Sequence, residues 1–507
     1  MPIATAGLTG FLPRLGDFAP LTQALAEGKS PLALSGLAAV HRAYVAAGLR
    51  QATGRPLVLV CPDDGEARRL AGDLAALTGG EVPLLPARDF LFHPGAASRQ
   101  WEHRRLALMR AMAAGEVPLL VAAVEGLLQR TLPPEELDRA WAELRTGGSY
   151  DLNQLAETLT AAGYSRCDQV EGVGQFALRG GILDVYSPGM EQPVRAEFFG
   201  DELDAMGLFD PATQRRTENV ERAVLLPAAE ALPHLAPGGT AGLAARLEKL
   251  AAGAEKAGRH ELAQTLRQDR EALEQGRSFP ATDRYLALIY PQLATAADYL
   301  PPDACVLFSE SSRVGERAKT YQWQLEEDAK SLMERGELDG SCAVLSRTFP
   351  ELNARLSDWP TAYLDSFTLS AYPVPPGCLL SVTAKQLPSF GASLETAVSD
   401  LDHYQRSGLG TLVLVSSEQR ALNLQTLLRE QGLRAAVEFQ PQTLPGPGET
   451  LVSVGGLSAG MEYPEARLAV LTEGQGAALK KPRPRKAASS TAVRASNTPA
   501  AWRAEYS

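Results

Sequence analysis

The sequence predicts an α/β fold in which a parallel-sheet domain is split by an α+β insert and followed by a further small α/β domain. Strand and helix patterns alternate from residue 1 to about 135. Short strand patterns crowd together between about 145 and 220, and strand–helix units return after residue 360. Repeated strand–helix units form a parallel sheet that helices cover on both faces. The length of 507 residues exceeds one core and predicts about three or four domains.

The first part of the split domain is expected over residues 1–140. Residues 31–50 read as a strand, a turn and an amphipathic helix, and a buried strand at Leu57–Val60 leads through a Pro-Asp-Asp turn into the next helix. The segments 82–94 and 117–134 supply two more strands. The insert then occupies residues 141–220, where hairpin-like strands predominate.

The second part of the split domain is expected over residues 221–355. Residues 242–277 are charged and alanine-rich, which predicts one long exposed helix, and Ala304–Phe308 reads as a buried strand. Residues 356–475 form the further small domain, with a strand–turn–helix unit followed by two strands around a glycine-rich turn. Residues 476–507 are rich in Pro, Ser, Ala, Lys and Arg without periodicity, which predicts a disordered tail.

Composition limits the classes of function. The chain contains no apolar run of about 18 residues, and its first residues lack the basic and apolar regions of a secretory signal. Its scattered cysteines form no CxxC or Cys/His pattern, so we expect reduced thiols in a cytoplasmic protein. They are Cys61, Cys167, Cys305, Cys342 and Cys378. The net charge of −11 opposes unaided binding to duplex DNA, because such binding neutralises phosphates, and it favours a protein partner.

A phosphate-binding loop decides whether a parallel-sheet domain of this kind uses ATP. Such a loop reads GxxxxGK[ST], where the lysine holds phosphate and the hydroxyl holds magnesium. At the expected strand-to-helix turn, Leu34–Tyr44, only Gly36 remains, and no Lys-Ser or Lys-Thr follows. Contact of His41 or Arg42 with an anion is an alternative to an ordinary turn packed on the sheet. The ordinary turn is the favoured interpretation.

Other catalytic patterns are equally incomplete. After the strand that ends at Phe308, Ser309 stands where a motor needs an aspartate, and Glu310 remains. The Gly-Leu-Ser-Ala-Gly run around Ser458 resembles a nucleophile elbow, with a glycine-rich turn as the favoured alternative. The histidines have no metal-ligand spacing. They are His41, His93, His103, His234, His260 and His403. We therefore predict no catalytic residue, no cofactor and no metal.

The stretch from Phe176 to Arg216 is the most informative part of the chain. At period two, Arg195, Glu197 and Phe199 share one face of a strand, and Val194, Ala196 and Phe198 share the other. An arginine beside an exposed aromatic ring is typical of a protein–protein hot spot. The alternative is that Phe199 packs under a neighbouring helix while Arg195 pairs with Glu197 or Asp201.

The same stretch resembles a known module. RGGILDVYSP, PVRAEFFGDELDAM and FDPATQRR follow one another at the spacing found in the UvrA-binding module of the excision-repair helicase UvrB and the bacterial transcription-repair coupling factor, Mfd. The resemblance extends upstream through Leu155–Gln175 and, more weakly, over residues 15 to 475. It implies that the split domain is a degenerate RecA-like helicase domain. The missing phosphate loop matches the N-terminal half of the coupling factor and differs from UvrB.

The resemblance implies a non-catalytic adaptor of transcription-coupled nucleotide-excision repair that binds UvrA. Carried over by position, the partner-binding residues are Arg179, Arg195 and Phe199. The acidic residues around them have two interpretations, partner contact or support and solubility of the hairpin; these are Glu197, Asp201 and Glu202. The Gly180-Gly181 pair is expected to allow a bulge or a close approach of strands.

The resemblance also bears on what lies beyond this stretch. In the family, a polymerase-binding domain and a motor follow, so contact with RNA polymerase or damaged DNA is expected only in a full-length protein. We expect this chain to lack the motor that covers the module, and therefore to bind UvrA constitutively. The alternatives are a remnant helicase that binds nucleotide or nucleic acid, and a general scaffold.

Overall fold

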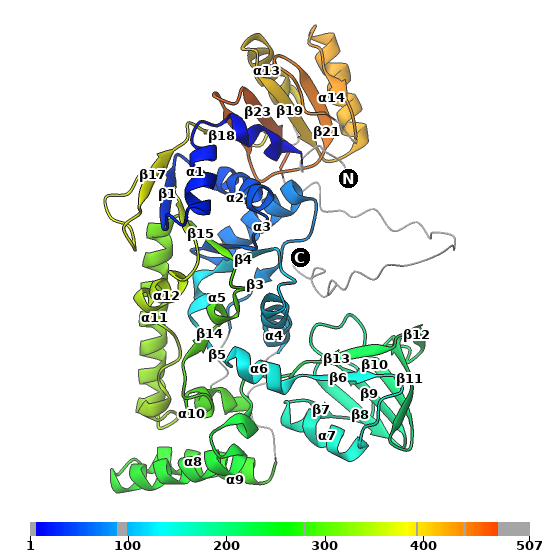
Figure 1. The fold of residues 1–507 in the computed structure, drawn as a ribbon, viewed down its shortest axis with the longest axis vertical. Coiled ribbons are helices and arrows are strands. Elements are labelled where there is room, and N and C mark those ends of the chain that lie inside the picture. Colours follow the sequence, from blue (N-terminus) through cyan, green and yellow to red (C-terminus); the bar gives the residue numbers. More distant parts are fainter. Residues whose placement is uncertain (1–6, 89–98, 277–279, 392–393, 440–442, 475–507) are drawn as a thin grey trace.

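The computed structural model describes residues 7–88, 99–276, 280–391, 394–439 and 443–474, and its fold is shown in Figure 1. The predicted tail and the end of the segment 82–94 lie outside these residues. Among the described helices, none is long and apolar enough to cross a membrane. The α/β class agrees with the prediction from the sequence.

The central sheet contains seven parallel strands in the order β17-β1-β16-β15-β2-β4-β3. They are β1 (Leu32–Ser35), β2 (Leu57–Cys61), β3 (Leu84–Leu85), β4 (Leu119–Ala123), β15 (Cys305–Ser309), β16 (Thr361–Leu364) and β17 (Cys378–Ser381). Successive residues of one strand enter different cores, since Leu57 and Leu59 belong to one hydrophobic cluster and Val58 and Val60 to the other. The sheet is therefore buried on both faces, as is usual for a parallel sheet.

Helices cover both faces of this sheet (Figure 1). One face carries α1 (Phe18–Ala26), α2 (Ala39–Thr53) and α3 (Asp64–Thr78), preceded by the 3-10 helix η1 (Leu8–Arg14). The other carries α4 (Gln100–Ala113), α5 (Val124–Leu128), α11 (Ser311–Glu334) and α12 (Phe349–Leu356). The remaining short elements of this part are α6 (Pro134–Ala140), α10 (Leu286–Ile289), β5 (Arg130–Thr131), β14 (Ala294–Thr295), η2 (Pro233–Leu235), η3 (Pro280–Tyr285), η4 (Ala296–Tyr299) and η5 (Gly340–Cys342).

The insert forms a separate module with its own hydrophobic core. Its six-stranded sheet has the order β12-β11-β10-β9-β8-β7, and α7 (Leu152–Ala161) packs on one face. The strands are β7 (Ser165–Arg166), β8 (Gln175–Arg179), β9 (Ile182–Tyr186), β10 (Val194–Phe199), β11 (Glu202–Phe209) and β12 (Arg216–Asn219). The chain enters through β6 (Ala142–Arg145) and leaves through β13 (Arg222–Leu225), and these two strands pair with each other. The module lies to one side of the central sheet in Figure 1.

A buried cluster of charges fixes the chain where it leaves the module. Glu230 accepts hydrogen bonds from Nη1 of Arg88 at 3.1 Å and Nε of Arg105 at 2.9 Å, and its amide donates to Oε1 of Glu102 at 2.6 Å. Burial alone would raise the pKa of Glu230, but Arg105 and Arg88 outweigh it and lower the pKa. Nearby, Nε2 of His103 lies 3.1 Å from the carbonyl oxygen of Ala228. The linker after the module is therefore held by both charge and hydrogen bonds.

The predicted long helix at residues 242–277 is wrong. The structure has two antiparallel helices, α8 (Gly239–Lys256) and α9 (His260–Glu274), which pack against each other (Figure 1). The chain reverses at Gly258, whose φ of 74° is left-handed and suits glycine. Across the reversal, Arg267 pairs with Glu255 at 3.1 Å. The charges that suggested one exposed helix include pairs between two helices.

A third sheet, of six strands, has the order β18-β22-β23-β19-β21-β20. Its elements are β18 (Lys385–Leu387), α13 (Leu394–Arg406), β19 (Gly410–Val415), α14 (Glu418–Glu430), β20 (Ala436–Val437), β21 (Thr450–Val454), β22 (Gly460–Tyr463) and β23 (Leu468–Thr472). One face packs against α13 and α14, and the other shares a hydrophobic cluster with α1 and α2. Strands β16 and β17 belong to the central sheet, so that sheet continues beyond residue 355, where the sequence analysis ended the split domain.

Candidate partner-binding site

Strand β10 presents two chemically different faces. Val194 and Ala196 are fully buried in the core of the module, whereas Arg195 and Glu197 lie on the opposite face. The pairing with β11 shifts register between Glu197 and Phe198, which marks a bulge or irregularity at this point. The faces that period-two alternation assigned to these residues agree with the structure.

Phe199 projects from the end of β10 and is 85% exposed, so it does not pack under a helix. It precedes a two-residue turn, Gly200-Asp201, in which Gly200 has a φ of 63°. Its neighbour Phe198 turns inward and meets Tyr150 edge to face, with ring centroids 6.3 Å apart. Of the two adjacent phenylalanines, one contributes to the core and the other offers its ring to solvent.

A buried carboxylate holds both predicted arginines. Asp184 lies opposite Arg195 in the pairing of β9 with β10, and it is fully buried. Arg195 donates to it through Nε at 2.7 Å and Nη2 at 2.8 Å, and Arg179 donates through Nη2 at 2.6 Å. The alternative pairing of Arg195 with Glu197 or Asp201 is therefore wrong. Glu197 instead pairs with Arg216 at 3.3 Å.

Arg195 is further enclosed on two sides. Its guanidinium carbon lies 4.6 Å from the centroid of the Phe209 ring, and Gln214 accepts from it through its side-chain oxygen at 3.2 Å. The hydrogen bond to Asp184 raises the pKa of Arg195, so the guanidinium stays charged. The side chain of Arg195 is 22% exposed, compared with 51% for Arg179. The two arginines share one partner but differ in their access to solvent.

The tip of the β8–β9 hairpin lies beside β10. Gly180 has a φ of 59°, and the oxygen of Gly181 accepts from the amide of Phe198 at 2.7 Å. A Cβ atom on Gly181 would approach the oxygen of Phe198 to 2.7 Å, which confirms a close approach of strands at this glycine pair. Ile182, directly after the turn, is 38% exposed and faces Glu197 across the strands. Sequence reasoning missed Ile182; the signal was a large apolar residue next to a tight turn.

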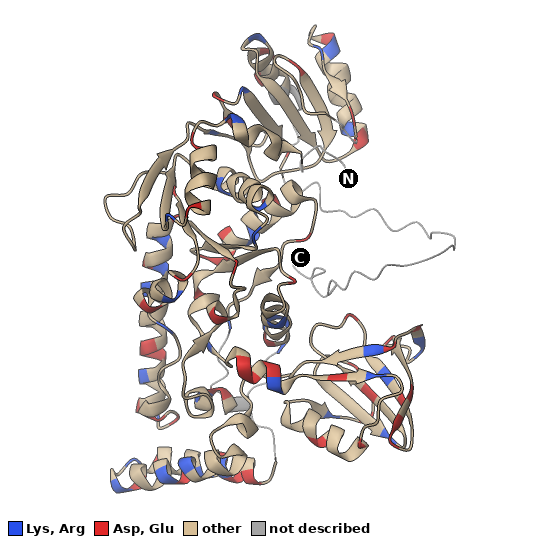
Figure 2. Ribbon diagram, in the orientation of Figure 1, with Lys and Arg blue, Asp and Glu red and all other residues tan. Residues whose placement is uncertain are grey.

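Figure 2 shows how charge is distributed over the module. Basic and acidic residues are interspersed along its strands. The exposed part of the site therefore combines Phe199 and Ile182 with the guanidinium of Arg179, beside the exposed acidic residues Asp201 and Glu202. Apolar groups with one accessible forked donor are suited to a protein surface that offers a pocket and an acceptor.

The turn that would hold phosphate in an ATP-using domain is filled by the chain itself. Gly36 has a φ of 90°, and a Cβ atom built on it would lie 2.0 Å from the backbone oxygen of Val382. Nδ1 of His41 accepts from the amide of Ala38 at 3.2 Å, and burial lowers the pKa of His41 to about 4. Arg42 is buried. Its guanidinium is thus unavailable to an outside anion, and the ordinary packed turn is supported.

Carboxylates of the protein surround Arg42. Its Nη2 donates to Glu66 at 3.1 Å, and its Nη1 pairs with Glu310. Ser309, at the aspartate position of a motor, donates its hydroxyl hydrogen to Glu66 at 2.7 Å. At the end of β16, burial raises the pKa of Asp365 to about 6. Glu66 and Glu310 thus neutralise Arg42 at this edge of the central sheet.

The remaining catalytic patterns do not assemble. Ser458 donates through its hydroxyl to Oδ2 of Asp73 at 2.6 Å, and its amide donates to Oδ1 at 2.6 Å. The glycine-rich run therefore forms a turn docked on α3, and the nucleophile elbow is wrong. Within the described residues, no three or more His, Cys, Asp or Glu side chains gather where they could hold a metal ion. His93 lies outside those residues.

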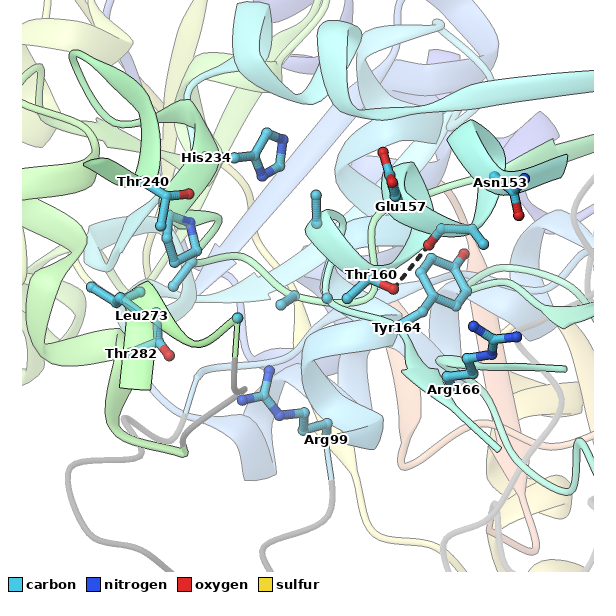
Figure 3. A pocket seen from close by; sticks show the side chains of 17 residues that line it. Arg99, Asn153, Glu157, Thr160, Tyr164, Arg166, His234, Thr240, Leu273 and Thr282 are labelled. Carbon is cyan, nitrogen blue, oxygen red and sulfur yellow. Dashed lines mark hydrogen bonds between the residues drawn. The ribbon is translucent and has the colours of Figure 1, made fainter. Parts of the chain in front are cut away.

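A cavity of about 760 Å³ lies where the module meets the central domain (Figure 3). Thr160 and Tyr164 of the module line one side, and His234 of η2 and Thr240 of α8 line the other. In Figure 3 the Thr160 hydroxyl bonds within its own helix, to the oxygen of Ala156 at 2.8 Å. The lining side chains come from separate segments of the chain and include Arg99, Glu157 and Arg166. The cavity therefore marks the joint between the two bodies.

Comparison with known proteins identifies what the module resembles. Residues 142–230 match the UvrB interaction domain. This range contains all residues of the candidate partner-binding site. The chain is also 28% identical over 488 residues to the transcription-repair-coupling factor of Bacillus subtilis (strain 168), covering 94% of this chain and 41% of that protein. The coupling factor of Staphylococcus haemolyticus (strain JCSC1435) is 27% identical over 473 residues, covering 90% and 39%. That of Staphylococcus aureus (strain USA300) is 24% identical over 476 residues, covering 92% and 40%.

The chain thus spans about two fifths of the length of the curated relatives it matches. The predicted similarity to the N-terminal region of the bacterial coupling factor, with a UvrB-like module inside it, is confirmed.

Proposed function

We propose that this chain is a non-catalytic adaptor of transcription-coupled nucleotide-excision repair, and that its UvrB-like module binds UvrA. The similarity to transcription-repair-coupling factors and the match of residues 142–230 to the UvrB interaction domain assign the chain to DNA repair. UvrA is the partner that the resemblance of the module implies. The observation that carries the proposal is Phe199, an 85% exposed aromatic ring at the tip of the β10–β11 hairpin.

The physical properties of the site support a protein partner. A large apolar side chain that is exposed in the free protein gains about 1.5–3 kcal/mol when a partner buries it fully. Beside it, Arg179 can offer forked donors to an acidic group of UvrA. The net charge of −11 favours such a contact over the phosphates of DNA. We place the adaptor in the cytoplasm, where its partner and its reduced thiols belong.

The packing of the turn between β1 and α2 supports a function that does not use ATP. Arg42 occupies the start of α2 and is neutralised by Glu66 and Glu310, and Val382 packs against Gly36. A nucleotide needs this same turn for its phosphates. Any contact with RNA polymerase or with damaged DNA is assigned to parts that the coupling factors possess beyond the region matched by this chain.

The test is an affinity measurement between the purified chain and immobilised UvrA by surface plasmon resonance. We expect measurable binding by the unaltered chain and a loss of affinity of about tenfold or more for R179A/F199A, because hot-spot truncations have effects of this size. F367A is the matched control, since Phe367 is 78% exposed but lies outside the module. An unaltered chain that fails to bind UvrA, or equal losses of affinity for R179A/F199A and F367A, would contradict the proposal.

A further inference from the structure

The two arginines of the site have unequal numbers of free donors. All three guanidinium nitrogens of Arg195 donate within the module: Nε and Nη2 to Asp184, Nη2 also to the Gln214 side chain, and Nη1 to the Gln214 backbone oxygen at 3.4 Å. Arg179 donates through Nη2 alone among the hydrogen bonds of the described chain. An arginine has five N–H donors, so Arg179 retains most of its capacity for a partner and Arg195 retains little.

Asp184 is the common support of both side chains. It projects from the interior strand β9, is fully buried and pairs with both arginines. The fork of Arg195 grips both oxygens, and the Phe209 ring closes the remaining face of that guanidinium. A bidentate pair fixes geometry more strongly than a single bond. Arg195 therefore fixes the position of Asp184. Asp184 in turn is the hydrogen-bond acceptor that holds Arg179.

We propose that Asp184 and Arg195 are positioning residues of the docking surface, and that the contacts with the partner are made by Arg179, Ile182 and Phe199. The inference rests on the proposed function for the identity of the partner, UvrA. Arg195 neutralises Asp184 and holds it in place, and Asp184 in turn orients Arg179. Ile182 and Phe199 supply the apolar area on either side of the tightly packed hairpin tips.

The first experiment needs no partner. Free chain is treated with phenylglyoxal, which modifies accessible arginines, and the rate at each arginine is read by mass spectrometry. We expect Arg179 to be modified faster than Arg195 in the unaltered chain. In D184N, both arginines lose their charged acceptor, and Arg195 is expected to approach the rate of Arg179. Equal rates at the two arginines of the unaltered chain would overturn the assignment, whatever the outcome with UvrA.

The second experiment separates contact from positioning through affinity for UvrA. R195K keeps a cation beside Asp184 but gives up the bidentate fork, so we expect it to lose less affinity than R179A, which loses about tenfold. We expect D184N alone to weaken binding. D184N added to R179A should change affinity by less than about twofold, because the effects of two substitutions are not additive when one residue acts through the other. R222A, an arginine of the stem away from the hairpin tips, is the control.

The outcomes distinguish the two proposals. If the unaltered chain does not bind UvrA, the proposed function fails, and the phenylglyoxal rates still decide the roles of Asp184 and Arg195. If UvrA binds but R195K is as weak as R179A, Arg195 is a contact residue and the positioning role is overturned. Multiplicative effects of D184N and R179A would overturn the link from Asp184 to Arg179. Unfolding curves of each variant identify those that have lost the fold.

Discussion

The hydroxyl of Ser458 donates to the buried carboxylate of Asp73 at 2.6 Å, although the two residues lie 385 positions apart in the chain. Ser458 belongs to the turn before β22, and Asp73 lies on α3. The bond therefore connects the third sheet to the central domain at a point where the two share a hydrophobic cluster. It makes the third sheet part of the same folded body.

Removing the hydroxyl should weaken this junction. S458A leaves one oxygen of Asp73 without that donor inside the protein, so we expect the free energy of unfolding to fall by about 1–3 kcal/mol. Urea unfolding followed by circular dichroism measures the change. S357A is the control, because Ser357 is exposed and bonds only within the end of α12. An equal effect of S458A and S357A would show that the junction bond contributes nothing.

Phe198 and Phe199 should behave in opposite ways. F198A removes a ring that packs against Tyr150 in the module core, and we expect it to lower the free energy of unfolding by about 2–4 kcal/mol. F199A removes an exposed ring, and we expect a change within about 0.5 kcal/mol. Thermal or urea unfolding of the two variants tests this directly. Comparable destabilisation by F199A would mean that its ring is packed in solution.

We expect Arg42 to contribute to the stability of the fold and not to bind nucleotide. R42A leaves Glu66 and Glu310 without their shared cation, a loss that costs about 3–5 kcal/mol in buried pairs. Because the turn is filled, we expect Mg-ATP to leave the melting temperature of the unaltered chain unchanged. Differential scanning fluorimetry measures both effects. A rise of several degrees with Mg-ATP would revive the remnant-helicase alternative.

Stability should depend on pH through His103. Burial lowers the pKa of His103 to about 4 in the folded chain, whereas an unfolded histidine has a pKa near 6.5. Between these values the unfolded chain binds the extra proton, so stability falls as the pH is lowered from 6.5 towards 4, by about 1.4 kcal/mol per pH unit. His41 acts in the same direction, and Glu102, whose burial raises its pKa to about 7, acts in the opposite one.

Comparison of the unaltered chain with H103Q isolates the contribution of His103. The difference in unfolding free energy between the two proteins, measured in urea at several pH values, should change through the window from 6.5 to 4. Contributions of His41 and Glu102 cancel in this difference because both proteins contain them. A difference that stays constant with pH would show that His103 titrates alike in the folded and unfolded chains.

Much of the architecture follows from local patterns. Apolar strands such as β2 and β15 are read from continuous runs of aliphatic residues, since a parallel sheet buries both faces. Two local features were also predictable from the sequence. The Gly180-Gly181 pair indicates a tight turn between strands, and Phe199 is an aromatic residue on an otherwise polar strand face. The structure assigns Arg179, Arg195 and Phe199 to one end of the module; their roles in binding stay predictions.

The errors arose where distant residues meet. Asp184 was missed as the partner of Arg195 because the register between β9 and β10, set by the whole sheet, brings them together. A single aspartate between Leu183 and Val185 was the available signal, since an isolated charge in an apolar strand requires a partner. The helix break at Gly258 was missed because alanine-rich segments on either side both favour helix, and only tertiary packing reverses the chain.

The pairing of β6 with β13 has a consequence for how such a protein arises. Ala142 lies opposite Leu225, and Arg145 lies opposite Arg222, so the chain leaves and re-enters the central domain at nearly the same place. A segment whose two ends are adjacent can be gained or lost in evolution without a change in the strand order of the central sheet. The pairing of β6 with β13 thus allows the module to be inherited as one segment, separately from the domain that carries it.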